Sequence, residues 1–199
     1  QIIADCYKAS GEPHPLASRN VLKQIIKLYE EAGLRAEVAP EVEFFLVHKN
    51  TDPDYELMPP RGRSGRREVA RMSFSIDAVA EFEDFVEDMY DFADEQALSV
   101  DTLIHENGAA QLEINFNHGD PLDMADQVFV FKRTVRETAQ RHNMYATFMA
   151  KPMQKEPGST LHIHQSILSV ATGANIFNGL DDQPTPELMH YIAGLQRYT

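Results

Sequence analysis

The sequence predicts an α+β protein with a mainly antiparallel, curved sheet flanked by helices. Segments with helical spacing of apolar residues alternate with segments of period two along the 199 residues, and several strands follow one another directly. The composition, 43% hydrophobic and 25% charged, is that of an ordinary globular protein. The chain is therefore expected to form a packed core rather than a disordered or fibrous structure.

The first third of the chain predicts one helix, one strand and one long loop. Residues 18–32 place apolar side chains at helical spacing, and Gly33 follows as a C-terminal cap. A strand is predicted from about 37 to 47, with Pro40 indicating an edge position or a bulge. Residues 50–73 are rich in Pro, Gly and Arg without a period, so they are predicted to form a loop.

The middle of the chain predicts an acidic helix and a strand pair. The helix covers residues 75–97, with Asp77 as its expected N-cap. Strands at 99–105 and 110–116 flank the turn signal Asn107-Gly108, which predicts an antiparallel pair.

The last third predicts two helices and two strands. Asp120 is the expected N-cap of a helix that ends near Asn143. Strands are predicted at 144–150 and 160–169, and a terminal helix is predicted to start at Thr185.

Charge and composition exclude several kinds of partner. A formal net charge of −13 repels phosphate backbones and anionic membrane surfaces, so neither nucleic acid nor a membrane is expected as a partner. Metal cations and cationic substrates fit better. A single cysteine, Cys6, excludes an internal disulfide and agrees with a reducing cytoplasm, which is the expected location. No apolar run approaches the length of a membrane span.

Acidic and imidazole side chains fall on predicted strands or strand ends, where charged groups are rare on a core-facing side. They are Glu41, Glu43, Glu106, Glu113, His162 and His164. Taken singly, an E-x-E strand is typical of a solvated sheet face, and an H-x-H strand is typical of surface or hydrogen-bonded core histidines.

Taken together, these residues indicate a metal site. Three separate strands each present an oxygen or imidazole donor, and several carboxylates can share one concave face only if a cation offsets their repulsion. Oxygen-rich sites with an imidazole suit Mg²⁺ or Mn²⁺ better than a structural Zn²⁺, which more typically uses Cys. A phosphate-bearing substrate such as ATP would be expected to bind together with such ions.

The spacing of Glu106 and Glu113 depends on the loop between them. A two-residue turn at Asn107-Gly108 would leave Glu113 about 13 Å further along the strand, at roughly 3.3 Å per residue. A wider loop over residues 107–112 would place the two carboxylates opposite each other, and this loop is the prediction.

Five stretches of the chain resemble the catalytic domain of the glutamine synthetase superfamily. They are "SRNVLKQI", "APEVEFFLV", "IHENGAAQLEINF", "YATFMAKPM" and "PGSTLHIHQS", in the family's order. The sequence looks closest to the branch of γ-glutamyl-amine ligases, typified by γ-glutamylputrescine synthetase.

The resemblance implies roles for individual residues. One divalent ion would be held by Glu43, Glu106 and Glu113, and a second by Glu41 and His162. His164 and Ser166 would lie on the nucleotide side, and Gly158 would fall in the loop that lines the substrate carboxylate pocket.

The implied reaction is an ATP-dependent ligation. ATP phosphorylates the γ-carboxylate of glutamate, and an amine or ammonia then attacks the acyl phosphate to form a γ-glutamyl amide. Mg²⁺ or Mn²⁺ neutralises charge on the phosphoryl group, so no protein nucleophile is required and no catalytic residue is assigned. Glutamine-forming members typically read Asn-Gly-Ser-Gly where this chain has Pro157 to Thr160, which favours a putrescine-like amine over ammonia.

The resemblance also implies that residues 1–199 are a fragment of the catalytic domain, without the family's N-terminal domain and the C-terminal part of the catalytic domain. We expect the full-length parent to be a homo-oligomer and the fragment alone to be inactive. Two other functions remain open: a metal-dependent hydrolase, and a non-catalytic structural or regulatory homologue.

Overall fold

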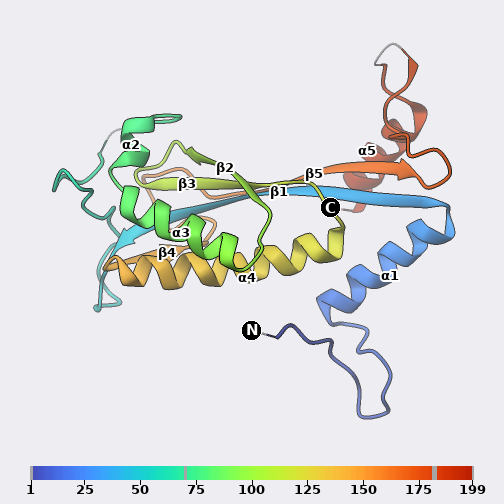
Figure 1. The fold of residues 1–199 in the computed structure, drawn as a ribbon, viewed down its shortest axis with the longest axis horizontal. Helices are drawn as coiled ribbons and strands as arrows, with labels where there is room; N and C mark the ends of the chain where they lie inside the picture. Colours follow the sequence, from blue (N-terminus) through green and yellow to red (C-terminus); the bar gives the residue numbers. More distant parts are fainter. Residues whose placement is uncertain (1, 70, 181–182, 199) are drawn as a thin grey trace. The chain divides into compact units, whose positions relative to one another are not determined.

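The structure is a computed structural model that describes residues 2–69, 71–180 and 183–198 (Figure 1). Helices and strands follow one another in an α+β order, which confirms the predicted fold class. In chain order they are α1 (Ser18–Glu31), β1 (Leu34–His48), α2 (Ile76–Ala80), α3 (Glu83–Glu95), β2 (Val100–His105), β3 (Gln111–Phe116), α4 (Pro121–Arg141), β4 (Met144–Thr147), β5 (Leu161–Ser169) and α5 (Pro186–Tyr198). None of the helices in the described ranges combines the length and the apolar run that a bilayer requires.

The five strands form one sheet in the order β2-β3-β1-β4, and β5 also pairs with β1. The pairings of β1 with β3, of β1 with β4 and of β2 with β3 are antiparallel. Glu43 is the register partner of Glu113, and Phe45 is the partner of Gln111. The predicted mainly antiparallel sheet is therefore confirmed.

The chain divides into two compact units. The first comprises Gln1–Val38, His118–Ala125 and His164–Thr199, and the second comprises Ala39–Asn117 and Asp126–Ile163.

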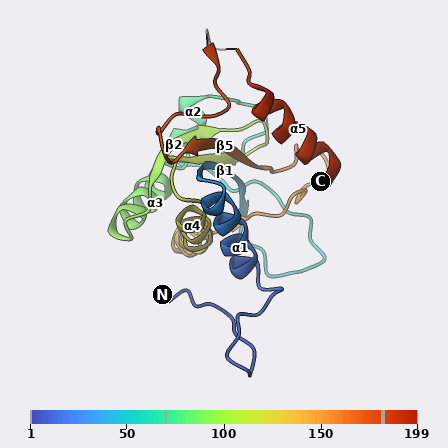
Figure 2. The ribbon, with the colours of Figure 1, turned by 90° about the vertical axis from the view of Figure 1, so that its right-hand side faces the viewer.

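The core of the second unit lies between the sheet and helices α3 and α4, which run along the same side of the sheet in both views (Figures 1 and 2). The Phe44 ring on β1 meets Phe85 of α3 edge to face, with ring centroids 6.4 Å apart. Phe116 on β3 meets Phe131 of α4 in the same way at 5.2 Å. These rings are buried, and aromatic pairs of this geometry add to the stabilisation from their buried area.

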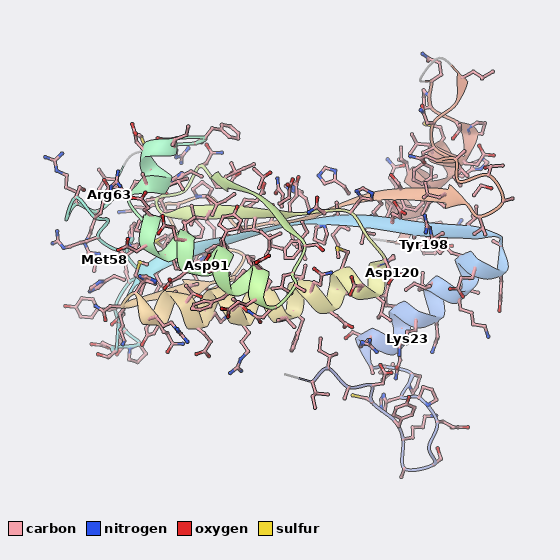
Figure 3. The ribbon with its side chains drawn as sticks, viewed as in Figure 1. Lys23, Met58, Arg63, Asp91, Asp120 and Tyr198 are labelled. Atoms are coloured by element: carbon pink, nitrogen blue, oxygen red, sulfur yellow. The ribbon has the colours of Figure 1, made fainter. Side chains whose placement is uncertain are left out.

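In the first unit, helix α1 ends as predicted. Gly33 has a φ of +71°, the left-handed conformation that closes helices and that glycine adopts without strain. Asp120 caps α4 as predicted, because its side chain accepts hydrogen bonds from the backbone N of Leu122 and of Asp123, at 2.9 and 3.1 Å (labelled in Figure 3).

The single acidic helix predicted over 75–97 is wrong, because the segment forms two helices. Glu81 and Phe82 separate α2 from α3, and Phe82 is buried. Burial of this ring outweighs the uninterrupted helical pattern of the sequence. Ser75 rather than Asp77 is the N-cap of α2, and its hydroxyl accepts a hydrogen bond from the Ala78 amide at 3.2 Å.

Two strand predictions also differ from the structure. Pro40 lies inside β1, which has neighbours on both sides, so the edge-strand alternative is wrong. The ladder with β3 starts only at Glu41, which leaves the missing N–H of Pro40 outside it. The predicted strand 144–150 ends at Thr147.

Candidate functional site

Side chains of β1 and β3 alternate between the helix-covered core and the opposite face. Phe44 of β1 and Leu112 and Ile114 of β3 are buried on the core side. The odd-numbered residues of β1 and β3 share the opposite face, since successive side chains of a strand point to alternate faces. On this face Glu43 lies beside Glu113, and Glu41 lies beside Asn115. The whole face belongs to the second unit.

Among the described residues, Glu41, Glu113 and His162 form a group that could hold a metal ion. Each offers one ligand atom, and these atoms all lie within 4.8 Å of one another. The His162 Nδ1 atom is 3.3 Å from Glu41 Oε2. The structure thus brings together residues from three strands, β1, β3 and β5, that lie far apart in the sequence.

Burial and, to a smaller extent, the neighbouring carboxylates of Glu41, Glu106 and Glu43 together raise the pKa of Glu113 from 4.5 to about 7. His162 acts in the opposite direction. A carboxyl group surrounded by like charges gains most from a nearby cation, because the cation removes both the repulsion and the cost of its burial.

Glu43 faces a different environment, since its carboxylate is surrounded by hydrogen-bond donors. Its Oε2 accepts from Gln111 Nε2 at 2.8 Å and from the Thr160 backbone N at 3.1 Å. Its Oε1 accepts from the Thr160 hydroxyl. Among the described residues, Glu43 and Glu106 are outside the 4.8 Å group.

Glu106 lies near the face but not where the sequence placed it. Its backbone N donates to the Gln111 carbonyl at 2.9 Å, and the register partner of Glu113 on β2 is Ile104. The connection is therefore residues 107–110, so the predicted wider loop over 107–112 is wrong. Glu106 lies opposite Gln111, two residues before Glu113 on β3, so the two glutamates share one face of the sheet. The effect of Glu106 on the pKa of Glu113 agrees with this proximity.

Three side chains accept hydrogen bonds from the amides of the turn, and two of them come from distant parts of the sequence. Gly108 N donates to Gln111 Oε1 at 2.9 Å, Ala109 N to Glu156 Oε2 at 3.1 Å, and Ala110 N to Glu68 Oε2 at 2.9 Å. Periodicity in the sequence cannot reveal such long-range hydrogen bonds.

The donor set fits a divalent cation such as Mg²⁺ or Mn²⁺. It consists of carboxylate oxygens and one imidazole, without a thiolate. Asn115, the register partner of Glu41, adds a side-chain oxygen that is buried without a hydrogen-bond partner among the described residues. An orphaned oxygen beside a cluster of carboxylates is a further sign that the face accommodates a cation or its water ligands.

Gly158 lies in the loop before β5. Its carbonyl accepts a hydrogen bond from Gln111 Nε2 at 3.0 Å, and a Cβ atom at this position would lie 2.8 Å from the carbonyl oxygen of Ala150. The next residue, Ser159, donates its backbone N to that same carbonyl at 2.9 Å. The loop therefore packs closely on residue 150, and glycine is required by the close approach.

His164 and Ser166 belong to the first unit and are described within it. The His164 side chain is exposed on β5, and the Ser166 hydroxyl accepts a hydrogen bond from Asn175 Nδ2 at 3.4 Å. Their predicted nucleotide-binding role stays a prediction.

Gln111, Thr160 and Asn115 are residues of this face that the sequence analysis does not single out. Gln111 shares its parity with Glu113, and a glutamine within the apolar run "QLEINF" is a signal that could have been used. Thr160 was noted only as a departure from the family's loop pattern.

Comparison with known proteins shows the family of the chain. The profile described as glutamine synthetase, catalytic domain, matches residues 15–199. The chain belongs to the glutamine synthetase catalytic-domain family. The predicted resemblance is therefore confirmed.

Two curated relatives and one solved structure show how this member of the family compares. γ-Glutamylputrescine synthetase PuuA of Escherichia coli K12 is 32% identical over 198 residues, which cover 98% of this chain and 42% of the relative. Glutamine synthetase of Pyrococcus abyssi is 32% identical over 188 residues, which cover 94% of this chain and 40% of the relative. A solved complex of GmaS with ADP matches with a TM-score of 0.78 and 27% identity, covering 93% of this chain and 41% of that one.

The glutamine synthetase catalytic-domain segment described here thus spans about 42% of the length of the first curated relative. The two relatives, a γ-glutamylputrescine synthetase and a glutamine synthetase, match this chain at equal identity. Overall similarity supports a ligase-family enzyme and does not distinguish an amine from ammonia.

Proposed function

We propose that the protein containing this chain is an ATP- and divalent-metal-dependent ligase that forms a γ-glutamyl amide from glutamate and an amine. The observation that carries the proposal is the convergence of Glu41, Glu113 and His162 within one face of a glutamine synthetase catalytic domain. A carboxylate cluster with a raised Glu113 pKa is suited to Mg²⁺ or Mn²⁺.

In this proposal the residues keep the roles that the family resemblance implies. Glu41, Glu43, Glu106, Glu113 and His162 hold the divalent ions, His164 and Ser166 contact ATP, and Gly158 contacts glutamate. The bound ions supply charge neutralisation for the transferred phosphoryl group. The chain's own contribution is to hold these donors on one rigid sheet face, because positioning and electrostatics carry phosphoryl transfer.

We further propose that the amine is a putrescine-like diamine rather than ammonia. The support is the loop at Pro157 to Thr160, where proline lacks a backbone donor and Thr160 binds Glu43 through both its amide and its hydroxyl. One named relative, PuuA, is a γ-glutamylputrescine synthetase. We expect the full-length parent to act in the cytoplasm as a homo-oligomer, which light scattering of the purified protein would test.

The experiment is a coupled assay of ADP release by the full-length parent with Mg²⁺, glutamate and either putrescine or ammonia. We expect ADP release to require both glutamate and the amine, and kcat/KM to be higher for putrescine. Glu113→Gln should abolish turnover. Glu137→Gln should not, because Glu137 is an exposed glutamate on α4 that forms an i,i+4 bridge to Arg133 at 3.7 Å.

Each alternative function predicts a different result in this assay. A higher kcat/KM for ammonia would make the protein a glutamine synthetase with an unusual loop. Metal-dependent bond cleavage without ATP would identify a hydrolase, and absence of turnover with every amine would favour a non-catalytic homologue.

A further inference from the structure

Gln111 connects three separate parts of the site through one buried side chain. It is 1% exposed, and both ends of its amide are engaged. Oε1 accepts from the Gly108 amide in the 107–110 turn at 2.9 Å. Nε2 faces Glu43 Oε2 at 2.8 Å, the Gly158 carbonyl at 3.0 Å and the Ser159 hydroxyl at 3.4 Å.

The position of Gln111 follows from the sheet register. It is the partner of Phe45, two residues from the Glu43–Glu113 pair and on the same face. From there an amide reaches the loop before β5 and the turn before β3 at once. A buried polar group without a hydrogen-bond partner costs free energy, so breaking any one of these hydrogen bonds is unfavourable while the groups stay buried.

An amide suits this position better than a charged or an apolar side chain. A carboxylate would face Glu43 and the Gly158 carbonyl without a donor, and it would add a negative charge to a face that already carries Glu41, Glu106 and Glu113. An apolar side chain would leave the Gly108 amide without its acceptor and would remove one of the two donors to Glu43 Oε2. Glutamine supplies one acceptor to the turn and donors to Glu43 and the loop, with no net charge.

We propose that Gln111 is a positioning residue that joins the Gly158–Thr160 loop to Glu43, so that the substrate loop and the metal-face carboxylate keep one relative geometry. Thr160 completes the connection from the loop side, because its amide and hydroxyl both donate to Glu43. A change at Gln111 therefore alters the loop and Glu43 together.

The two ends of the amide can be separated by substitution. Gln111→Glu keeps an oxygen that can accept from the Gly108 amide but loses the donor to Glu43, Gly158 and Ser159. Gln111→Met removes both. The control is Gln127→Met on α4, which removes a part-buried side-chain acceptor of the Ser99 backbone N, at 2.7 Å, elsewhere in the second unit.

Hydrogen exchange of the metal-free protein, resolved to single amides, tests the loop connection directly. Exchange of the Thr160 amide should become at least about tenfold faster in Gln111→Glu and in Gln111→Met, whereas the Gly108 amide should lose protection only in Gln111→Met. Gln127→Met should leave both amides as in the wild type. Unchanged Thr160 exchange in Gln111→Glu, or an equal loss across all amides as expected of general destabilisation, would overturn the proposal.

A second measurement rests on the proposed function. In the full-length parent, Gln111→Glu should raise KM for glutamate by about tenfold, the order seen when a residue that orients a ligand is removed, and leave KM for ATP unchanged. If the parent proves to have no ligase activity, the exchange experiment still decides the role of Gln111, because it requires neither substrate nor turnover. A rise in KM for ATP without a rise in KM for glutamate would contradict a role of Gln111 at the Gly158–Thr160 loop.

Discussion

Glu43 and Glu113 are register partners on neighbouring strands, yet their carboxyl groups have opposite surroundings. Glu43 accepts hydrogen bonds from Gln111 and from Thr160. The Glu113 carboxyl group is buried near three other carboxylates, and its pKa is therefore raised to about 7. Burial and like charges disfavour the charged form of Glu113, whereas both oxygens of the Glu43 carboxylate accept hydrogen bonds.

The raised pKa of Glu113 predicts that the metal-free protein loses stability as pH rises. Between 4.5 and about 7 the folded state holds a proton on Glu113 that the unfolded state has released, so the free energy of unfolding falls through this window. The total loss is on the order of 3 kcal/mol, from 1.36 kcal/mol per pKa unit between 4.5 and about 7. Urea unfolding in EDTA at pH 5 and pH 8 measures it.

Glu113→Gln should flatten this dependence and make the protein more stable than the wild type at pH 8. Glu137→Gln, which changes an exposed acid, should keep the wild-type slope. If the slope were the same in Glu113→Gln and in the wild type, another group would be responsible.

Divalent cations should stabilise the protein through Glu41, Glu113 and His162. At pH 8, Mn²⁺ at a hundred times its Kd should add about 2.7 kcal/mol to the free energy of unfolding, because it binds the folded state alone. Thermal unfolding with increasing Mn²⁺ measures this shift. Glu41→Gln and His162→Asn should each remove most of it, whereas an equal shift in these variants and in Glu137→Gln would place the ion elsewhere.

Gly158→Ala should destabilise the protein by about 1–3 kcal/mol, because the new methyl group would overlap the Ala150 carbonyl oxygen. The contrasting change is Gly194→Ala within α5, where nothing lies within 4 Å of the added Cβ. This second substitution should stabilise by about 0.5–1 kcal/mol, the helix preference of alanine over glycine. Chemical unfolding of the two variants checks both signs, and a neutral Gly158→Ala would show that the loop can move away from residue 150.

Ser75→Ala should cost about 1 kcal/mol of stability, because the Ala78 amide would lose its capping hydrogen bond. Asp77→Ala removes only an acidic residue of the first turn and should cost less, about 0.3–1 kcal/mol. The reverse order in urea unfolding would restore Asp77 as the cap.

The sequence was sufficient for the face of the sheet on which each site residue lies, because parity along a strand needs only local spacing. Glu41 and Glu43 fall on one face of β1 for this reason, whereas the alignment of Glu113 with Glu43 depends on the register between β1 and β3. Hydrogen bonds across long separations were not predictable from spacing. The register of Glu106 depends on Glu68 and Glu156, and the break between α2 and α3 depends on the burial of Phe82.

Amide contacts to the 107–110 turn and to Glu43 set the order in which the site can assemble during folding. The β2–β3 hairpin is local, but its turn is bound by Glu68 and Glu156, 42 and 47 positions away from the amides that they accept from, and Glu43 meets Thr160 across 117 positions. Long-range contacts carry the greatest loop-closure entropy and slow folding. We therefore expect pulse-labelled amides of β2 and β3 to gain protection from exchange before the amide of Thr160. The hairpin would then exist for a time before the contact between Thr160 and Glu43 has formed.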